Sequence, residues 1–176
     1  MKKTIRKRSG NKRRNEVTRV DGGASPSTLY SEALAMARNG ETRTVVPLLR
    51  AAATAGHAMA AHALAIWYLR GIGVRKNFAK AVALERIAAQ AGISEAIYNL
   101  AISHEKGQGA KRNPVEALRL YRAAARRGDV DAMYDVGRCL FYGIGTAKNE
   151  RLGRRWVLRS EASRSGPRRG EENDKP

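Results

Sequence analysis

Small and apolar residues recur along this chain at intervals of four residues, and glycines separate one group from the next. Ala60, Leu64 and Tyr68 are spaced in this way, which places them on one face of a helix. Runs in which apolar and polar residues alternate with a period of two are missing, and such runs are the signal for strands. The pattern therefore predicts an all-α protein.

The same pattern returns every 36 residues. The clearest markers are three Gly-Xaa-Gly turns, which begin at Gly71, Gly107 and Gly143. Four further columns keep the spacing: Asn77, Asn113 and Asn149; Gly56, Gly92 and Gly128; Ala60, Ala96 and Ala132; and Leu64, Leu100 and Val136. Self-similarity at a fixed period of this length predicts a stack of helical repeats.

Each repeat is predicted to hold two helices. The first helices are expected over about 60–70, 96–106 and 131–142, and they end at the paired glycines because Gly readily adopts a positive φ. The second helices are expected over about 78–91, 114–127 and 150–163, and an asparagine precedes each at the N-cap position.

The second helices are expected to bury one stripe each. Its members are Ala81, Leu84 and Ala88, repeated as Ala117, Leu120 and Ala124. Moving this stripe back by one period gives Val45, Leu48 and Ala52, so a second helix is also expected over 42–55, with a first helix before it over 27–38. Leu100 and Leu120 are predicted to be core residues of the best-formed repeat.

These residues resemble the Sel1-like repeat, a relative of the tetratricopeptide repeat, whose pattern is A-x-x-x-L-G-x-x-Y-x-x-G-x-G-V followed by A-x-x-W-x-x-x-A-A-x-x-G. Matching positions in the first clear unit are Ala60, Leu64, Tyr68, Gly71, Gly73, Val74, Ala81, Ala88, Ala89 and Gly92. The chain departs from the pattern where His104 and Leu140 replace Tyr, and where Leu84 and Leu120 replace Trp. The resemblance covers about 27–163. It implies an α-solenoid of about four stacked antiparallel helix pairs that form a right-handed superhelix.

Three segments are predicted. Residues 1–25 form a basic arm, residues 26–164 form the solenoid, and residues 165–176 form a tail. Within the solenoid the units are 27–56, 57–92, 93–128 and 129–164. Both ends are poor in large apolar side chains, so they cannot offset the entropy of ordering and are expected to be disordered.

The charge of the chain is strongly positive, +18, and it is uneven. Residues 1–20 hold nine Lys and Arg and one Glu, a net charge of +8. A basic arm of this kind attracts nucleic acid or other polyanions without reading their sequence.

No catalytic, cofactor-binding or metal-binding residues are predicted. None of the Gly-Xaa-Gly turns continues as a phosphate-binding loop, and His57 and His62 are not spaced as a metal pair. His104 falls in a packing column, and Cys139 is expected to be a half-buried packing residue. No set of nucleophile, base and orienting group converges, so the protein is not expected to be an enzyme.

The expected location is cytoplasmic. Cys139 is the single cysteine and cannot form a disulfide within the chain, which fits a reducing compartment. The basic N-terminus is not followed by the apolar region of a signal peptide, and no stretch approaches 18 apolar residues, so no membrane span is expected.

Two candidate surfaces follow from the repeat. The resemblance implies that first helices line a concave groove, and the residues expected to face a partner there are Ile66, Arg70, Asn99, Ile102, Lys106, Asp135, Arg138 and Tyr142. The second surface is a basic patch on the second helices, formed by Arg119, Arg122, Arg126, Arg151, Arg154 and Arg155. We expect an adaptor or scaffold that binds a protein partner through the groove. The alternative is a nucleic-acid-associated protein that uses the basic arm and the arginines.

Overall fold

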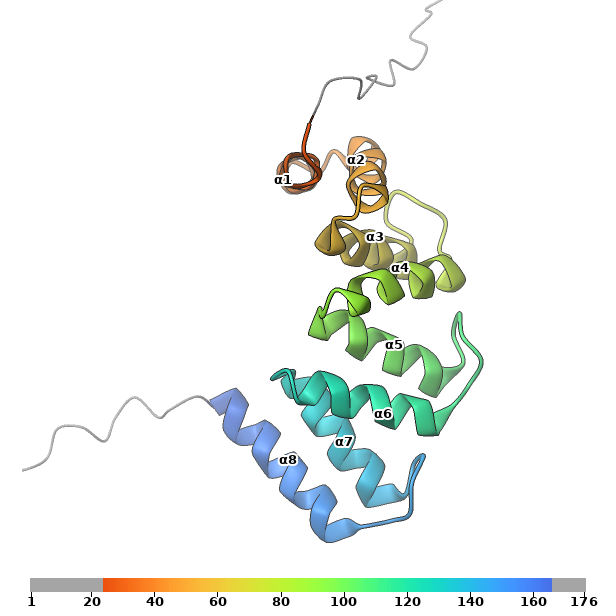
Figure 1. Ribbon diagram of the computed structural model, residues 1–176, viewed down its shortest axis with the longest axis vertical. Coiled ribbons are helices and arrows are strands. Elements are labelled where there is room, and N and C mark those ends of the chain that lie inside the picture. The colour runs from red at the N-terminus through yellow and green to blue at the C-terminus, as the bar shows by residue number, and fades with distance from the viewer. Residues whose placement is uncertain (1–23, 166–176) are drawn as a thin grey trace, which may run out of the picture.

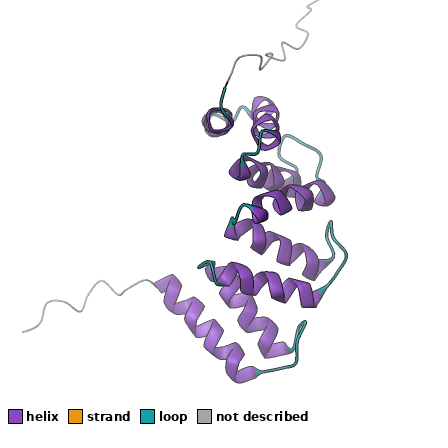
Figure 2. Ribbon diagram, in the orientation of Figure 1, coloured by secondary structure: helices purple, strands orange, loops and turns teal. Residues whose placement is uncertain are grey.

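The computed structural model describes residues 24–165, and this part of the chain is helical throughout, with no strand (Figures 1 and 2). The eight helices are α1 (Pro26–Arg38), α2 (Thr42–Thr54), α3 (Ala58–Arg70), α4 (Phe78–Gln90), α5 (Ser94–Lys106), α6 (Pro114–Ala125), α7 (Val130–Tyr142) and α8 (Glu150–Ser165). They form four sequential pairs, and each helix packs against the next one in the chain. The pairs stack into an elongated array, so the predicted all-α solenoid is confirmed (Figure 1). The predicted arms at 1–25 and 165–176 lie outside the described residues, apart from their innermost positions.

The helix ends follow the predicted chemistry. The side-chain oxygen of Asn113 accepts a hydrogen bond of 3.1 Å from the backbone N–H of Glu116, and Asn77 and Asn149 cap α4 and α8 in the same way. The first helices end at the first glycine of each pair, where the backbone of Gly107 has a φ of 71°. The repeated asparagines and glycines therefore mark the boundaries between helices.

Several helix limits differ from the prediction. Helices α3 and α5 begin two residues earlier than expected, at Ala58 and Ser94. At α3 the reason is a cap that the sequence pattern did not reveal, because His57 Nδ1 accepts a hydrogen bond of 3.1 Å from the backbone N–H of Ala60. Helix α6 ends two residues early, at Ala125, and α8 continues to Ser165.

The buried face of the second helices is wider than the predicted stripe, of which every member except Leu48 and Leu84 is buried. Leu84 is only half-buried, whereas its neighbour Glu85 is 1% exposed, and Leu48 and Leu49 differ in the same way. Each of these second helices contacts both its own first helix and the first helix of the next repeat. Burial on two sides therefore extends the covered face to the neighbouring residue positions.

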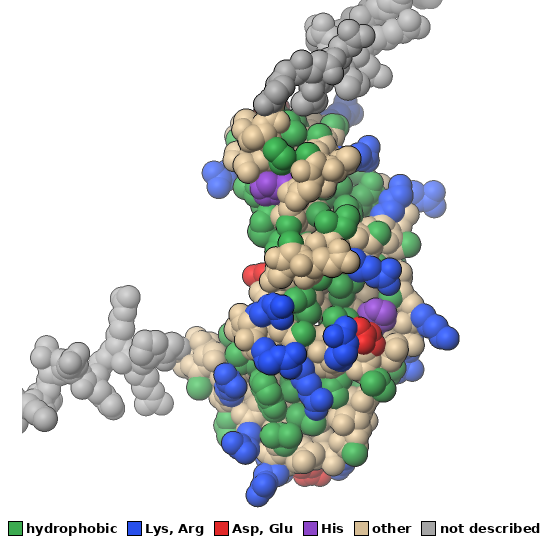
Figure 3. All heavy atoms as spheres, in the orientation of Figure 1, with side chains coloured by type: hydrophobic (Ala, Val, Ile, Leu, Met, Phe, Trp, Pro, Cys, Tyr) green, Lys and Arg blue, Asp and Glu red, His purple; other side chains and the backbone are tan. Residues whose placement is uncertain are grey.

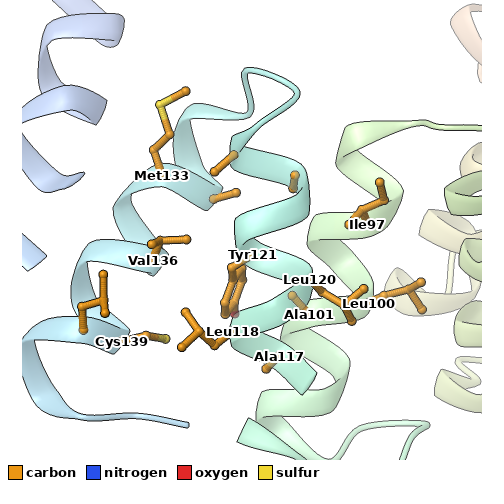
Figure 4. Close-up of a cluster of buried hydrophobic side chains, with 14 of the residues drawn as sticks. Ile97, Leu100, Ala101, Ala117, Leu118, Leu120, Tyr121, Met133, Val136 and Cys139 are labelled. Carbon is orange, nitrogen blue, oxygen red and sulfur yellow. The ribbon is translucent and has the colours of Figure 1, made fainter. Parts of the chain in front are cut away.

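The core consists of two clusters along the stack. One cluster contains residues of α1, α2 and α3 together with Ala81 of α4. The other contains Val82 of α4 and residues of α5, α6 and α7. Leu100 and Leu120 are buried in the second cluster, as predicted. The ring of Tyr121 is fully buried on the side of α6 that faces α7 (Figure 4). Alanines fill many of the remaining core positions, which lets the helix axes approach closely.

The turns inside each repeat contact the preceding repeat. A Cβ on Gly109 would overlap the backbone at Phe78, the first residue of α4, and a Cβ on Gly145 would overlap Pro114 at the start of α6. Only glycine allows these turns to lie so close to the neighbouring backbone. The second glycine of each pair therefore fixes how one repeat is placed on the last.

Within residues 24–165, none of the helices combines the length and the apolar character needed to cross a lipid bilayer.

Candidate protein-interaction surfaces

The eight residues predicted to line the groove lie on α3, α5 and α7, the first helices of successive repeats. They form rows that run along the stack with one residue from each repeat. Two rows are half-buried: Ile66, Ile102 and Arg138 form one, and Asn99 and Asp135 form the other. The third row, Arg70, Lys106 and Tyr142, is exposed. An open row beside partly covered apolar and polar side chains is an arrangement that can contact a bound polypeptide.

Asp135 and Arg138 belong to a network that joins the last two repeats. The Arg138 guanidinium donates from Nε to Asp135 Oδ1 and from Nη2 to Glu105 Oε2, both at 2.8 Å. The Tyr98 hydroxyl donates to Asp135 Oδ2 at 3.0 Å, and the Tyr121 hydroxyl donates to Glu105 Oε2 at 2.7 Å. These side chains therefore hold α7 against α5 and α6, in addition to any part they have in binding.

The network fixes the charges of its members. Burial raises the pKa of Glu105, but the hydrogen bonds from Arg138 and Tyr121 outweigh it and hold this pKa below its usual value. Burial also lowers the pKa of Arg138, and the two carboxylates more than compensate, so the net shift of this pKa is upward. Burial and the Asp135 charge raise the pKa of Tyr98. At neutral pH the guanidinium and the Glu105 carboxylate are charged and the Tyr98 phenol is neutral.

A second network joins α3, α4 and α5. His62 Nδ1 lies 2.9 Å from Glu85 Oε2, and Asn99 Nδ2 donates to Glu85 Oε1 at 2.7 Å. Glu85 is fully buried and His62 nearly so. The hydrogen bond to Glu85 is the main cause that raises the pKa of His62 above 6.5, against the opposing effect of burial. Asn99, predicted to face a partner, thus uses its amide inside this contact between repeats.

Sequence reasoning did not identify His62, Glu85 or Glu105 as connecting residues. One signal was available for Glu85, because it shares a column with Tyr121 and Val157. A carboxylate in a column that is otherwise bulky and apolar indicates a buried charge that needs a donor.

Five of the six predicted basic-patch residues lie on α6 and α8, and the sixth, Arg126, directly follows α6. Arg122 on α6 is half-buried. On α6, Arg119 donates two hydrogen bonds, of 2.7 and 2.6 Å, to Glu116. Arg126, at the C-cap of α6, is exposed. On α8, Arg151, Arg154 and Arg155 are all exposed. Figure 3 shows Lys and Arg side chains spread over the face in view, interleaved with apolar side chains and with few acidic ones.

Cys139 and His104 occupy positions within the helix packing. Cys139 is 1% exposed, so the expected half-buried position is wrong, because Cys139 packs into the core beside Leu118 and Val136. Burial raises the pKa of the Cys139 thiol to about 11, which keeps it protonated at neutral pH. His104 is half-buried, as expected for its column, with Nδ1 3.2 Å from the carbonyl oxygen of Lys111. Between residues 24 and 165 no three His, Cys, Asp or Glu side chains gather in a way that could hold a metal ion.

Comparison with known families identifies the repeat. The model of the Sel1 repeat matches this chain three times, over residues 58–93, 94–129 and 130–161. These ranges correspond to α3–α4, α5–α6 and α7–α8. A comparison with curated protein sequences found no match.

Two solved structures share the fold. One is a protective antigen present in uropathogenic Escherichia coli strains that displays an SLR fold, with 24% sequence identity and a TM-score of 0.75 over 78% of this chain. The other is a Sel1 repeat protein from Oxalobacter formigenes, with 24% identity and a TM-score of 0.74 over 77% of this chain. The chain spans 30% of the length of the first protein and 58% of the second. At this level of identity the likeness concerns the fold.

Proposed function

The chain belongs to the Sel1 repeat family, and from this we propose that it is a non-enzymatic adaptor that holds a protein partner along the first helices of its repeats. Sel1 repeat proteins are in general scaffolds for protein interaction. The observation that carries the proposal is the exposed row of Arg70, Lys106 and Tyr142, which crosses three repeats at one residue per repeat. Beside it, Ile66 and Ile102 offer partly exposed apolar surface.

The charge of this row defines the partner segment that it suits. Arg70 and Lys106 are cationic, and among residues 24–165 neither of them forms a salt bridge with a carboxylate. The two exposed cations are therefore free to meet carboxylates on a partner, and the isoleucines to meet an apolar side chain.

The test uses substitutions that leave the networks between repeats intact. Arg70→Glu combined with Lys106→Glu reverses the charge of the row without touching a core side chain, whereas Arg86→Glu on α4 makes the same kind of change elsewhere on the surface. Proteins captured from the native host by the wild-type chain are quantified by mass spectrometry. We expect the partner to be lost with the double variant and retained with Arg86→Glu. If both variants retain it, the partner does not use this row.

The alternative function is binding of nucleic acid, and one observation supports it: the net charge of +18, with +8 in residues 1–20. About six phosphate contacts would reduce the affinity roughly a thousandfold when salt rises from about 50 to about 200 mM. We expect deletion of residues 1–20 to abolish most RNA or DNA binding in a filter or anisotropy assay. If the shortened chain binds as tightly and with the same salt dependence, the arginine stripes on α6 and α8 form the binding site.

We propose a cytoplasmic location for this adaptor. The support is the single cysteine, Cys139, which is buried and has no cysteine to pair with in the chain. Fluorescent tagging of the chain in its host, followed by fractionation, would test the location.

A further inference from the structure

A groove of about 500 Å³ lies between α7 and α8. These two helices are the last pair of the described stack (Figure 1). Phe141 and Val157 are partly buried in it, and Tyr134 and Leu158 are exposed, the latter by 63%. Large apolar side chains gathered on an open surface in this way indicate an interaction site.

The repeat itself shows what covers this surface elsewhere in the molecule. One period before Tyr134, Phe141 and Val157 stand Tyr98, Glu105 and Tyr121. In the unit formed by α5 and α6 these residues contact α7, because Tyr98 donates to Asp135 and Glu105 accepts from Arg138. The surface between α5 and α6 that corresponds to the groove is therefore covered by the next first helix.

The repeat before it shows the same arrangement. Glu85 is the equivalent of Val157 two periods earlier, and it is covered by α5, whose Asn99 donates to it. In the units α3–α4 and α5–α6, a helix therefore lies across the position that the groove occupies in the unit α7–α8. Shape and position thus define the occupant as a helix.

The side chains of the groove differ from their equivalents in a consistent way. Its centre is more apolar, because Phe141 replaces Glu105 and Leu158 replaces Arg122. Its rim is more charged, because Arg154 replaces Leu118 and Glu161 replaces Ala125. Arg154 is 71% exposed, and its nearest carboxylate, on Glu150, lies 3.7 Å away, so it is available to a second acidic group.

We propose that this groove docks an amphipathic helix of a partner protein, whose apolar face packs on Phe141, Val157 and Leu158 and whose flanking carboxylates meet Arg154 and the Tyr134 hydroxyl. The model for the last contact is the hydrogen bond that Tyr98, the equivalent of Tyr134, donates to Asp135. The surface is separate from the exposed row of Arg70, Lys106 and Tyr142 except at its edge, where Tyr142 belongs to both.

A second copy of the chain suits the groove less well. Its first helix, α1, would have to take the place of α7, but Leu34 is the one large apolar side chain that α1 exposes, beside Thr28, Ser31 and Glu32. Helix α1 has one acidic residue, Glu32, and one basic residue, Arg38, so it brings no excess of carboxylates to the rim. Residues 166–176 of the chain, GPRRGEENDKP, contain no apolar side chain other than proline. A separate acidic helix is the occupant that the chemistry favours.

The test uses two synthetic helical peptides with the same Leu and Ala face, one flanked by Glu and the other by Lys. Each is titrated into the labelled full-length chain, and backbone amide shifts are followed by NMR. We expect the Glu peptide to perturb amides of α7 and α8, and Leu158→Ala to weaken its binding by about tenfold or more. Val115→Ala is the matched control, because Val115 is 66% exposed but lies on α6 outside the groove.

Arg154→Glu should reverse the preference, so that the Lys peptide binds more tightly than the Glu peptide. The proposal is overturned if neither peptide perturbs α7 and α8 at about 1 mM, a concentration that detects even weak affinity, or if Leu158→Ala and Val115→Ala behave alike. It is also overturned if sedimentation shows self-association that Leu158→Ala abolishes, because the occupant is then a second copy. None of these results depends on Arg70 or Lys106, so the proposed function is tested separately.

Discussion

Gly109→Ala should destabilise the protein far more than Gly92→Ala, although both glycines have a positive φ. The φ values are 74° and 89°, a region in which a Cβ costs about 1–2 kcal/mol. Around Gly92 nothing lies within 4 Å of an added Cβ. A Cβ on Gly109 would stand 2.5 Å from the carbonyl carbon of Phe78 and 3.0 Å from the amide nitrogen of Ala79.

These separations determine the additional cost. Carbon atoms in contact prefer about 3.5–4.0 Å, so the turn and the start of α4 must move apart by about 1 Å. Both sides of the contact are backbone, which cannot rotate away as a side chain can. Displacing packed elements in this way costs about 1–3 kcal/mol beyond the backbone term. We therefore expect Gly109→Ala to lower the free energy of unfolding by about 2–5 kcal/mol, and Gly92→Ala by about 1–2 kcal/mol.

Urea unfolding followed by circular dichroism measures both values on the full-length chain. The slope of the transition should be reported with the midpoint, because a repeat array can lose cooperativity when one contact between repeats is weakened. If the two variants are destabilised equally, the turn does not press on α4, and the account of how repeats are placed on each other is wrong.

Three further predictions concern the polar networks and the core. Glu85 raises the pKa of His62, so the contribution of this pair to the free energy of unfolding is complete below about pH 6 and should decline as the pH rises through the raised pKa. His62→Asn should remove this pH dependence, which urea unfolding at several pH values measures. Arg138→Met should cost about 2–4 kcal/mol by thermal or urea unfolding, because it leaves two partly buried carboxylates without their cation, and a loss below about 0.5 kcal/mol would show that water replaces the guanidinium. Cys139 should react with a thiol reagent only as fast as the protein opens, and labelling of the native protein at the rate of a free thiol would contradict its burial.

The fold was accessible from the sequence because its signals are local. Paired glycines end helices, asparagines begin them, and alanines at intervals of four mark the close contacts between helices. Leu100 and Leu120 are buried as predicted, so the helical phase was correct to within one residue. The sequence did not predict that Glu85 is more deeply buried than Leu84, because burial by the next repeat depends on how the helix pairs are offset in space.

The contacts between repeats could not be paired from the sequence for the same reason. Tyr98 and Asp135 are 37 residues apart, and Glu105 and Arg138 are 33 apart, on either side of the 36-residue period. Which offset brings two side chains together depends on the rotation from one repeat to the next, and no residue encodes that rotation locally. The residues predicted to face a partner lie on the first helices, as expected. The sequence did not reveal that Asp135 and Arg138 are already hydrogen-bonded to each other within the protein.

The two polar networks make the repeats non-interchangeable. Removing residues 93–128 would join two units with matching glycines and alanines, and the backbone fold alone would allow these two units to stack. Asp135 would then occupy the place of Asn99 and present a carboxylate to the buried carboxylate of Glu85, where an amide now donates a hydrogen bond. Loss or duplication of whole units by recombination, the usual route by which repeat arrays change length, would therefore produce a mispaired junction here. The order of units in this protein is constrained by pairs of side chains, and its length can change only together with them.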